Sequence, residues 1–135
     1  MIPDFKTLIG RLKVNEGFRS KVYKCTAGVD TFGHGLTWIT EEESANILAN
    51  RVSELHLEIG QKFDWYDSMP PEIKGVIIEM CYQLGKTGFS KFKKAIAHMQ
   101  NAEWQLAANE MLDSLWAKQT PNRATQLAGI VAEYK

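Results

Sequence analysis

Residues 16–35 read EGFRSKVYKCTAGVDTFGHG and depart more than any other part of the chain from a helical pattern. Strand-forming side chains recur along this stretch, and glycines stand where turns and bulges need them. We expect a small antiparallel sheet of two or three short strands here, between Phe18 and Thr37. Hairpins and loops beside a rigid helix commonly carry catalytic groups. The polar candidates in this stretch are Glu16, Tyr23, Cys25, Thr26, Asp30 and Thr31.

A short amphipathic helix is expected before the sheet, and a long helix after it. Residues 4–14 place apolar side chains on one helical face, and Gly17 supplies the helix end. Thr40 and Glu43 have the spacing of a capping box at the start of the long helix, whose apolar residues recur at helical intervals up to Gly60. A helix of that length spans about 30 Å at ~1.5 Å per residue, which is enough to join two lobes.

The rest of the sequence is predicted to be helical. A pair of prolines opens a helix that ends at Gly85, residues 86–88 form a turn, and a Thr-Pro pair at 120–121 begins the last helix. Two further helices fall around residues 92–99 and 104–111. The fold class is therefore α+β and mostly helical, with a small N-terminal β-hairpin lobe and a helical C-terminal lobe joined by the long helix.

The length and composition of the chain fit one compact domain. Its 135 residues include 44% hydrophobic and 24% charged side chains, which is typical of a globular protein. We expect a single domain over residues 1–135, with lobes at about 15–60 and 61–135 and the N-terminal helix at 4–14.

Charge and cysteine content argue against several function classes. Lys plus Arg and Asp plus Glu both number 16, so the chain lacks the basic excess that nucleic-acid binding needs. Two cysteines are too few for a disulfide framework or a four-cysteine zinc site, and no metal or other cofactor is expected. No apolar run approaches the ~18 residues that cross a bilayer, and the first ten residues do not resemble a secretory leader. We expect a monomer that is made in the cytoplasm and does not insert into a membrane.

Three sequence blocks resemble the phage-type lysozymes, glycoside hydrolase family 24. The catalytic stretch of that family has Glu-Gly, then Tyr, then Asp or Cys, then Gly and Thr, then Gly-x-Gly, and residues 16–35 contain these in order. The candidate cysteine stands nine positions after the glutamate, and the threonine six positions after the cysteine, as in the family. Residues 82–88, YQLGKTG, and residues 116–124, WAKQTPNRA, resemble two later blocks of the same family.

The resemblance implies a lysozyme-like fold and hydrolysis of the β-1,4 bond between N-acetylmuramic acid and N-acetylglucosamine in peptidoglycan. It makes Glu16 the general acid that protonates the leaving oxygen, a role that needs a protonated carboxyl near neutral pH. Thr31 would hydrogen-bond the attacking water or the sugar. Arg123 would pair with Glu16 and orient it.

Cys25 departs from the Asp that many relatives carry at this position. A carboxylate is ionised at pH 7, whereas an unperturbed thiol with a pKa of about 8.5 is only a few per cent thiolate. Cys25 could be a thiolate base for water, which gives inversion, a nucleophile, which gives retention, or a positional residue only. Asp30 is an alternative acidic partner, although strand alternation should point it away from Thr31. Leu36 stands where many relatives have a His, and His34 is not expected to replace that residue.

Further side chains are candidates for contact with the substrate. Amides suit the N-acetyl groups of the sugars, although an amide can equally cap or brace a helix. The candidate substrate-binding residues are Gln83, Gln119, Asn122, Arg123 and His34. A basic patch for an anionic wall is expected from Lys21, Lys24, Lys91, Lys93 and Lys94. Trp116 is interpreted as a core residue rather than a stacking platform, and Cys81 as a core thiol.

The leading functional interpretation is an endolysin that accumulates in the cytoplasm of a host bacterium and lyses it for phage release. Such an enzyme needs a phage-encoded membrane pore, a holin, to reach peptidoglycan in the periplasm or cell wall. The alternative is a lytic transglycosylase on the same fold, in which the C6 hydroxyl of muramic acid attacks and leaves a 1,6-anhydro end. A thiol peptidase built on Cys25 and a silent wall-binding module are two weaker alternatives.

Overall fold

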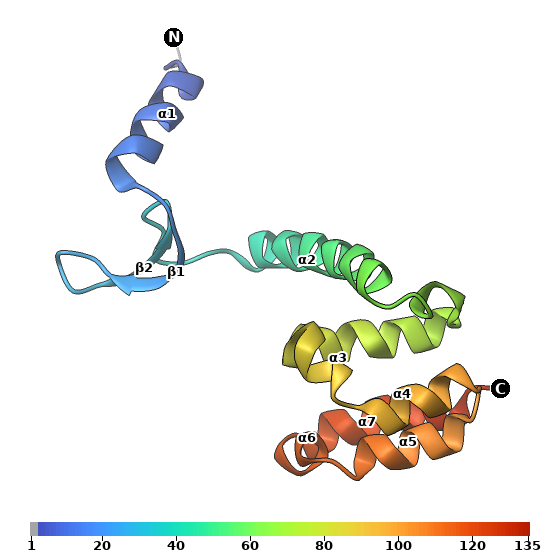
Figure 1. The fold of residues 1–135 in the computed structure, drawn as a ribbon. Coiled ribbons are helices and arrows are strands. Elements are labelled where there is room, and N and C mark those ends of the chain that lie inside the picture. The colour runs from blue at the N-terminus through green and yellow to red at the C-terminus, as the bar shows by residue number, and fades with distance from the viewer. Residues whose placement is uncertain (1–2) are drawn as a thin grey trace. The chain divides into compact units, whose positions relative to one another are not determined.

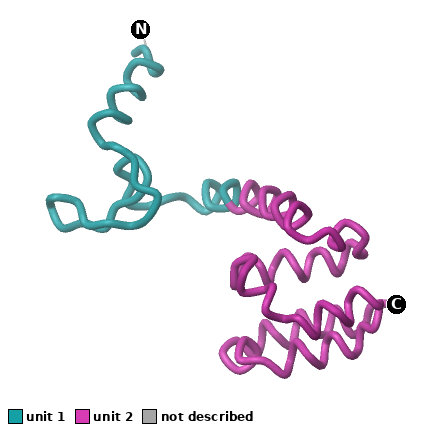
Figure 2. The backbone as a smooth tube through the Cα atoms, in the orientation of Figure 1, with its two compact units in different colours: residues 1–47 teal, residues 48–135 magenta. Residues whose placement is uncertain are grey.

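The computed structural model describes residues 3–135, and it divides the chain into two compact units, Met1–Ile47 and Leu48–Lys135 (Figure 2). The chain is mostly helical with one small antiparallel sheet (Figure 1), which confirms the predicted fold class. The prediction of a single domain with a lobe boundary near residue 60 stays a prediction. None of the helices in residues 3–135 combines the length and the apolar character needed to cross a membrane.

Unit 1 begins with helix α1, Phe5–Glu16. The Asp4 carboxylate caps this helix by accepting hydrogen bonds from the backbone N–H of Thr7 at 3.2 Å and from the Thr7 hydroxyl at 2.6 Å. These bonds, the side-chain one first, lower the pKa of Asp4. The helix ends at Gly17, as predicted, where a φ of 66° lets the Gly17 N–H donate to the Lys13 carbonyl at 3.0 Å. The expected helix stopped at residue 14, whereas α1 continues two residues further and makes Glu16 its last helical residue.

A β-hairpin follows, made of β1, Arg19–Lys24, and β2, Asp30–Gly33. The strands pair antiparallel with Tyr23 opposite Thr31, so the predicted small sheet is confirmed with two strands. The turn between them is held by two backbone bonds, from the Cys25 N–H to the Val29 carbonyl at 3.0 Å and from the Gly28 N–H to the Cys25 carbonyl at 2.8 Å. Cys25 and Thr31 are six positions apart in the sequence, and the hairpin therefore places them on the two sides of one turn.

A second tight turn lies directly after β2. Phe32 and Leu36 exchange both of their backbone N–H to carbonyl bonds, each 2.8 Å long, and enclose residues 33–35. Gly33 and Gly35 have φ values of 59° and 76°, which side-chain-bearing residues rarely adopt. The Gly-x-Gly motif is thus the sequence signature of this turn.

Helix α2, Glu41–Lys62, contains the boundary between the two units. Its start is the predicted capping box, in which the Thr40 N–H donates to Glu43 Oε1 at 3.0 Å and the Glu43 N–H donates to Thr40 Oγ1 at 3.1 Å. Toward its end, Ile59 is fully buried in unit 2. The helix passes the predicted end at Gly60 by two residues.

Unit 2 consists of the later part of α2, a short 3-10 turn and five further helices. These elements are η1 Tyr66–Ser68, α3 Pro71–Ser90, α4 Lys93–Gln100, α5 Trp104–Leu112, α6 Leu115–Gln119 and α7 Pro121–Glu133. Helix α7 packs against α5, α3 and α6, and α4 packs against α5. Nineteen buried apolar residues form one core in this unit, among them Tyr66, Ile77, Phe89 and Leu127.

The predicted helix end at Gly85 is confirmed, because Gly85 takes φ 76° and ψ 162° and separates two helical stretches within α3. The predicted turn at residues 86–88 is wrong, because these residues begin the second stretch, which continues to Ser90. Phe89 is fully buried, so packing of this side chain holds the segment helical despite its turn-like sequence. The Lys86 ammonium also donates to Glu58 Oε2 on α2 at 3.0 Å.

The predicted start of the last helix is confirmed in position, with Thr120 before Pro121 in the first turn of α7. The Thr120 hydroxyl does not cap α7. It donates to the Trp116 carbonyl at 3.0 Å and so closes the preceding five-residue helix α6.

Candidate active site

Glu16 is placed at the end of α1, directly before the chain turns into the hairpin. Its carboxyl group lies against the backbone of Gly35 in the second turn, since a Cβ added to Gly35 would overlap Glu16 Oε2. The residue that was predicted to be the general acid therefore contacts the glycine turn of the same unit. The sequence offered a signal for this contact, the Gly-x-Gly motif, but it indicated only a turn.

Cys25 and Thr31 lie on the two sides of the hairpin turn. Thr31 is only 4% exposed, and its hydroxyl donates to the Val29 carbonyl at 2.8 Å. The pKa of Cys25 is lowered by hydrogen bonds from the backbone N–H of Val29 first and then from that of Ala27. Successive backbone N–H groups of a turn form a concave site that favours negative charge. The structure thus brings Cys25 and Thr31 together and stabilises the thiolate form of Cys25.

Asp30, the alternative acidic partner, points to the other face of the hairpin. Its carboxylate pairs with the Lys24 ammonium at 2.6 Å, and both side chains are largely exposed. Thr31 beside it is buried, as strand alternation predicts. The exposed ion pair thus places the Asp30 carboxylate away from the buried Thr31, and the role of Asp30 as an alternative acidic partner stays a prediction.

His34 stands inside the glycine turn, one residue before Gly35. Its ring lies 5.2 Å from the ring of Phe18, measured between centroids. Leu36 is engaged in the backbone pairing with Phe32. His34 is exposed and belongs to the turn that contacts Glu16, and its predicted contact with substrate stays a prediction.

The candidate residues of unit 2 have contacts of their own. Trp116 is 5% exposed, and its Nε1–H donates to Gln83 Oε1 at 2.9 Å, so Trp116 is a core residue and Gln83 braces it. Arg123 Nη2 lies 3.9 Å from Glu79 Oε1. The predicted pairing of Arg123 with Glu16 joins residues of different units and stays a prediction, as do the predicted substrate contacts of Gln83 and Asn122.

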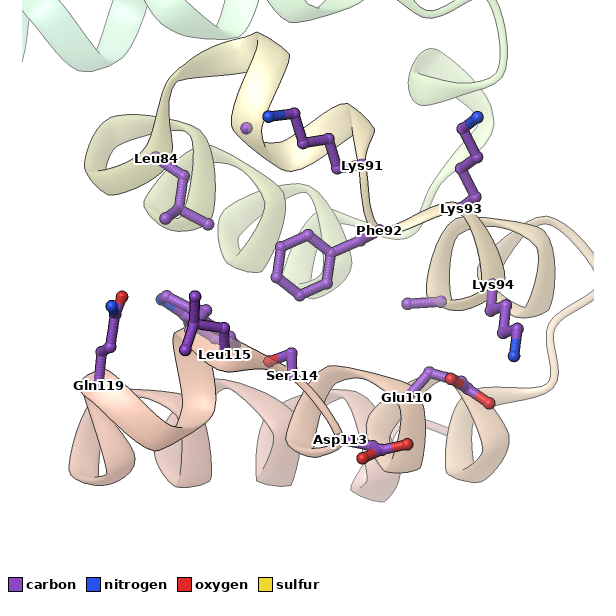
Figure 3. Close-up of a pocket in the computed structure, with 13 residues that line it drawn as sticks. Leu84, Lys91, Phe92, Lys93, Lys94, Glu110, Asp113, Ser114, Leu115 and Gln119 are labelled. Carbon is purple, nitrogen blue, oxygen red and sulfur yellow. The ribbon is translucent and has the colours of Figure 1, made fainter.

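A pocket of about 550 Å³ opens in unit 2 (Figure 3). The Phe92 ring projects into its middle, and Leu84, Leu115 and Trp116 supply further apolar lining. Its charged and amide lining is formed by Lys91, Lys93, Lys94, Glu110, Asp113 and Gln119. The pocket lining thus includes Gln119, which was predicted to bind substrate, and three lysines of the predicted basic patch.

The sequence did not predict Leu115, Glu110 or Asp113 as pocket residues. They belong to α6, to α5 and to the link between these helices, and only the packing of α3 and α4 against this region makes them line one space. Within residues 3–135, no cluster of three or more His, Cys, Asp or Glu side chains has a metal-binding arrangement.

The hydrogen bond between Trp116 and Gln83 yields a stability prediction. Trp116→Phe leaves the half-buried Gln83 oxygen without this donor and should lower the free energy of unfolding by about 1–3 kcal/mol, beyond the loss of indole packing. Urea unfolding followed by circular dichroism measures this effect. Trp104→Phe is the matched control, because it deletes the same atoms from a half-buried Trp whose ring packs edge-on against Tyr134. Equal losses in the two variants would contradict a stabilising role for the bond.

Comparison with known proteins identifies the family. The chain matches the phage lysozyme family over residues 13–133 and belongs to it. It is similar to "Probable T4-type lysozyme 2" of Dictyostelium discoideum, at 32% identity with 92% of this chain and 95% of that protein covered. It is also similar to "Probable T4-type lysozyme 1" of the same organism, at 26% identity with 89% and 90% covered. Membership of this family implies muramidase-type hydrolysis of peptidoglycan.

Proposed function

We propose that the protein is an endolysin muramidase that hydrolyses the β-1,4 bond between N-acetylmuramic acid and N-acetylglucosamine. The observation that supports this most directly is the hairpin turn of unit 1. At the position where many family members carry Asp, the backbone N–H groups of Val29 and Ala27 in this turn lower the pKa of the Cys25 thiol. An acid at the end of α1 and a stabilised anion in the hairpin are the two groups that glycoside hydrolysis uses.

In the proposed reaction Glu16 transfers its proton to the glycosidic oxygen as the bond to the anomeric carbon breaks. The Cys25 thiolate removes a proton from a water molecule, whose oxygen forms the new bond to the anomeric carbon. The products are a Glu16 carboxylate, a Cys25 thiol and two sugar ends, and return of the proton to Glu16 through solvent completes the cycle. Use of water by this route inverts the anomeric configuration, whereas direct attack by Cys25 would retain it.

The pocket of unit 2 is proposed as part of the surface that holds peptidoglycan. Its apolar lining, its lysines and its carboxylates can receive an apolar group together with charges of either sign. Gln119 at its edge supplies an amide for an N-acetyl group. The predicted role in wall affinity of Lys91, which follows α3, and of Lys93 and Lys94 on α4 is part of this proposal.

The biological setting follows as part of the same proposal. The enzyme would act as a monomer, accumulate in the cytoplasm of the host bacterium, and reach the wall through a holin pore to release phage. Peptidoglycan would be its partner, without a cofactor.

Mass spectrometry of the soluble fragments from purified peptidoglycan tests the proposed chemistry. We expect disaccharide-peptides that end in a reducing N-acetylmuramic acid, each heavier by one water than an anhydro product. Digestion in ¹⁸O-labelled water should place the label on that reducing end. Fragments with 1,6-anhydro ends would instead support the transglycosylase, and free stem peptides with intact glycan would contradict both.

A further inference from the structure

Gly35 makes an unusually close approach to one side chain. A Cβ at this position would overlap Glu16 Oε2 and lie 2.8 Å from Cδ and 3.1 Å from Cγ of the same residue. Real Cβ atoms essentially never come this close to another heavy atom, so a side chain at position 35 and the observed Glu16 conformation exclude each other. All three close atoms belong to the residue proposed as the general acid.

The turn that carries Gly35 is held in place from both sides. The paired backbone bonds between Phe32 and Leu36, each 2.8 Å, close the loop around it. Packing of the His34 ring against Phe18 connects the same loop to the residue that follows Gly17 at the end of α1. A Cβ at position 35 would therefore be accommodated by movement of the Glu16 side chain rather than of the turn.

The conformations of Glu16 matter for its proposed role. A Glu side chain has three rotatable bonds, and an exposed one at a helix end samples many positions of its carboxyl group. Proton transfer to a glycosidic oxygen needs the carboxyl within hydrogen-bonding reach of that atom. A misplacement of about 1 Å can reduce a rate about 100-fold.

We infer that Gly35 is a positioning residue for Glu16. Because Gly35 has no side chain, the Glu16 carboxyl group packs directly against the backbone at this position. This inference rests on the proposed function, because it assigns Gly35 a role through the proposed acid. The absence of a side chain is the feature that matters, so the smallest substitution should be sufficient to disturb catalysis.

Gly35→Ala is the direct test. We expect kcat on peptidoglycan to fall about 10- to 100-fold while KM stays within about twofold, since Ala displaces the acid and leaves the sugar-binding groups in place. In a Glu16→Gln background the same substitution should cause no further loss, because its effect passes through the carboxyl group.

Gly28→Ala is the matched control for backbone strain. Gly28 has a φ of 77°, close to the 76° of Gly35, but a Cβ there would meet no atom of the described residues within 4 Å. Both substitutions should lower Tm by a similar amount through the unfavourable φ, because the overlap in Gly35→Ala is relieved by movement of the exposed Glu16 side chain.

The outcomes separate the two proposals. If Glu16→Gln is inactive and Gly35→Ala has the wild-type kcat, the positioning role of Gly35 is wrong and the proposed function is unaffected. Full activity of Glu16→Gln overturns the proposed function and the role of Gly35 with it. If Gly35→Ala does not fold, nuclear Overhauser contacts between Gly35 Hα and Glu16 Hγ in the wild-type protein decide the question: we expect strong contacts, and their absence overturns the inference.

Discussion

Glu16→Gln is expected to abolish lysis of purified peptidoglycan, with kcat reduced about 10²- to 10⁴-fold. An amide has the size of a carboxyl group but cannot give up a proton to the leaving oxygen. Because Glu16 is an exposed residue at a helix end, the substitution should change Tm by little. Release of dyed fragments from purified walls measures the rate, and thermal unfolding confirms that the variant is folded.

Glu133→Gln is the matched control for this experiment. Glu133 is likewise the last residue of its helix, α7, and is exposed, so the same chemical change is made at the same kind of position. Its activity should equal that of the wild type. Retention of more than half of the wild-type kcat in Glu16→Gln would contradict the general-acid role.

Substitutions of Cys25 are expected to show whether activity depends on the negative charge of this side chain or on its size. Cys25→Ser should lower kcat about 10- to 100-fold, because a serine hydroxyl stays protonated in the same nest of backbone N–H groups. Cys25→Asp should keep most of the activity, because a carboxylate is ionised at neutral pH and can accept the proton of the attacking water. Cys81→Ala is the control, since Cys81 is buried in unit 2 and burial raises its pKa to about 12. Full activity of Cys25→Ser would demote the thiol to a packing role.

The pH dependence provides a second test of the same residue. Hydrogen bonds from the Val29 and Ala27 N–H groups lower the pKa of Cys25, so the thiolate persists to lower pH than an ordinary thiol allows. If the thiolate is the base, kcat is high above that pKa and declines as the pH falls through it. In Cys25→Asp the same decline should move to lower pH, toward the ordinary aspartate value of about 3.9. If kcat of Cys25→Asp declines at the same pH as that of the wild type, a group other than residue 25 causes the decline.

The elements that were predicted correctly are those with local signals. Asp4 and Gly17 delimit α1, and the Thr40–Glu43 capping box starts α2, because caps depend on residues within one helical turn. The turn predicted at residues 86–88 failed for the opposite reason. It is the burial of Phe89 beside Phe63 and Trp65, more than twenty positions away in the sequence, that decides the conformation there.

The candidate site likewise has features that local sequence signals predicted and features that they did not. The proximity of Cys25 and Thr31 follows from motif spacing, because a hairpin brings residues that are a few positions apart to the two sides of one turn. The contact between Glu16 and Gly35 was not predictable, because it depends on how the end of α1 meets a turn about twenty residues later. The pocket was not predictable either, because its lining comes from α3, α4, α5 and α6.

The packing of α7 has a consequence for the order in which the chain acquires its structure during synthesis. Ala124, Leu127, Ala128 and Val131 of α7 are buried in the same core as Ile59 of α2. Residues 121–133 must therefore have left the ribosome before that core can close, although α2 is made some sixty residues earlier. The hairpin of unit 1 needs only partners close in sequence, and such local contacts form rapidly. Nascent chains that end before α7 should thus carry a paired hairpin and an open helical unit.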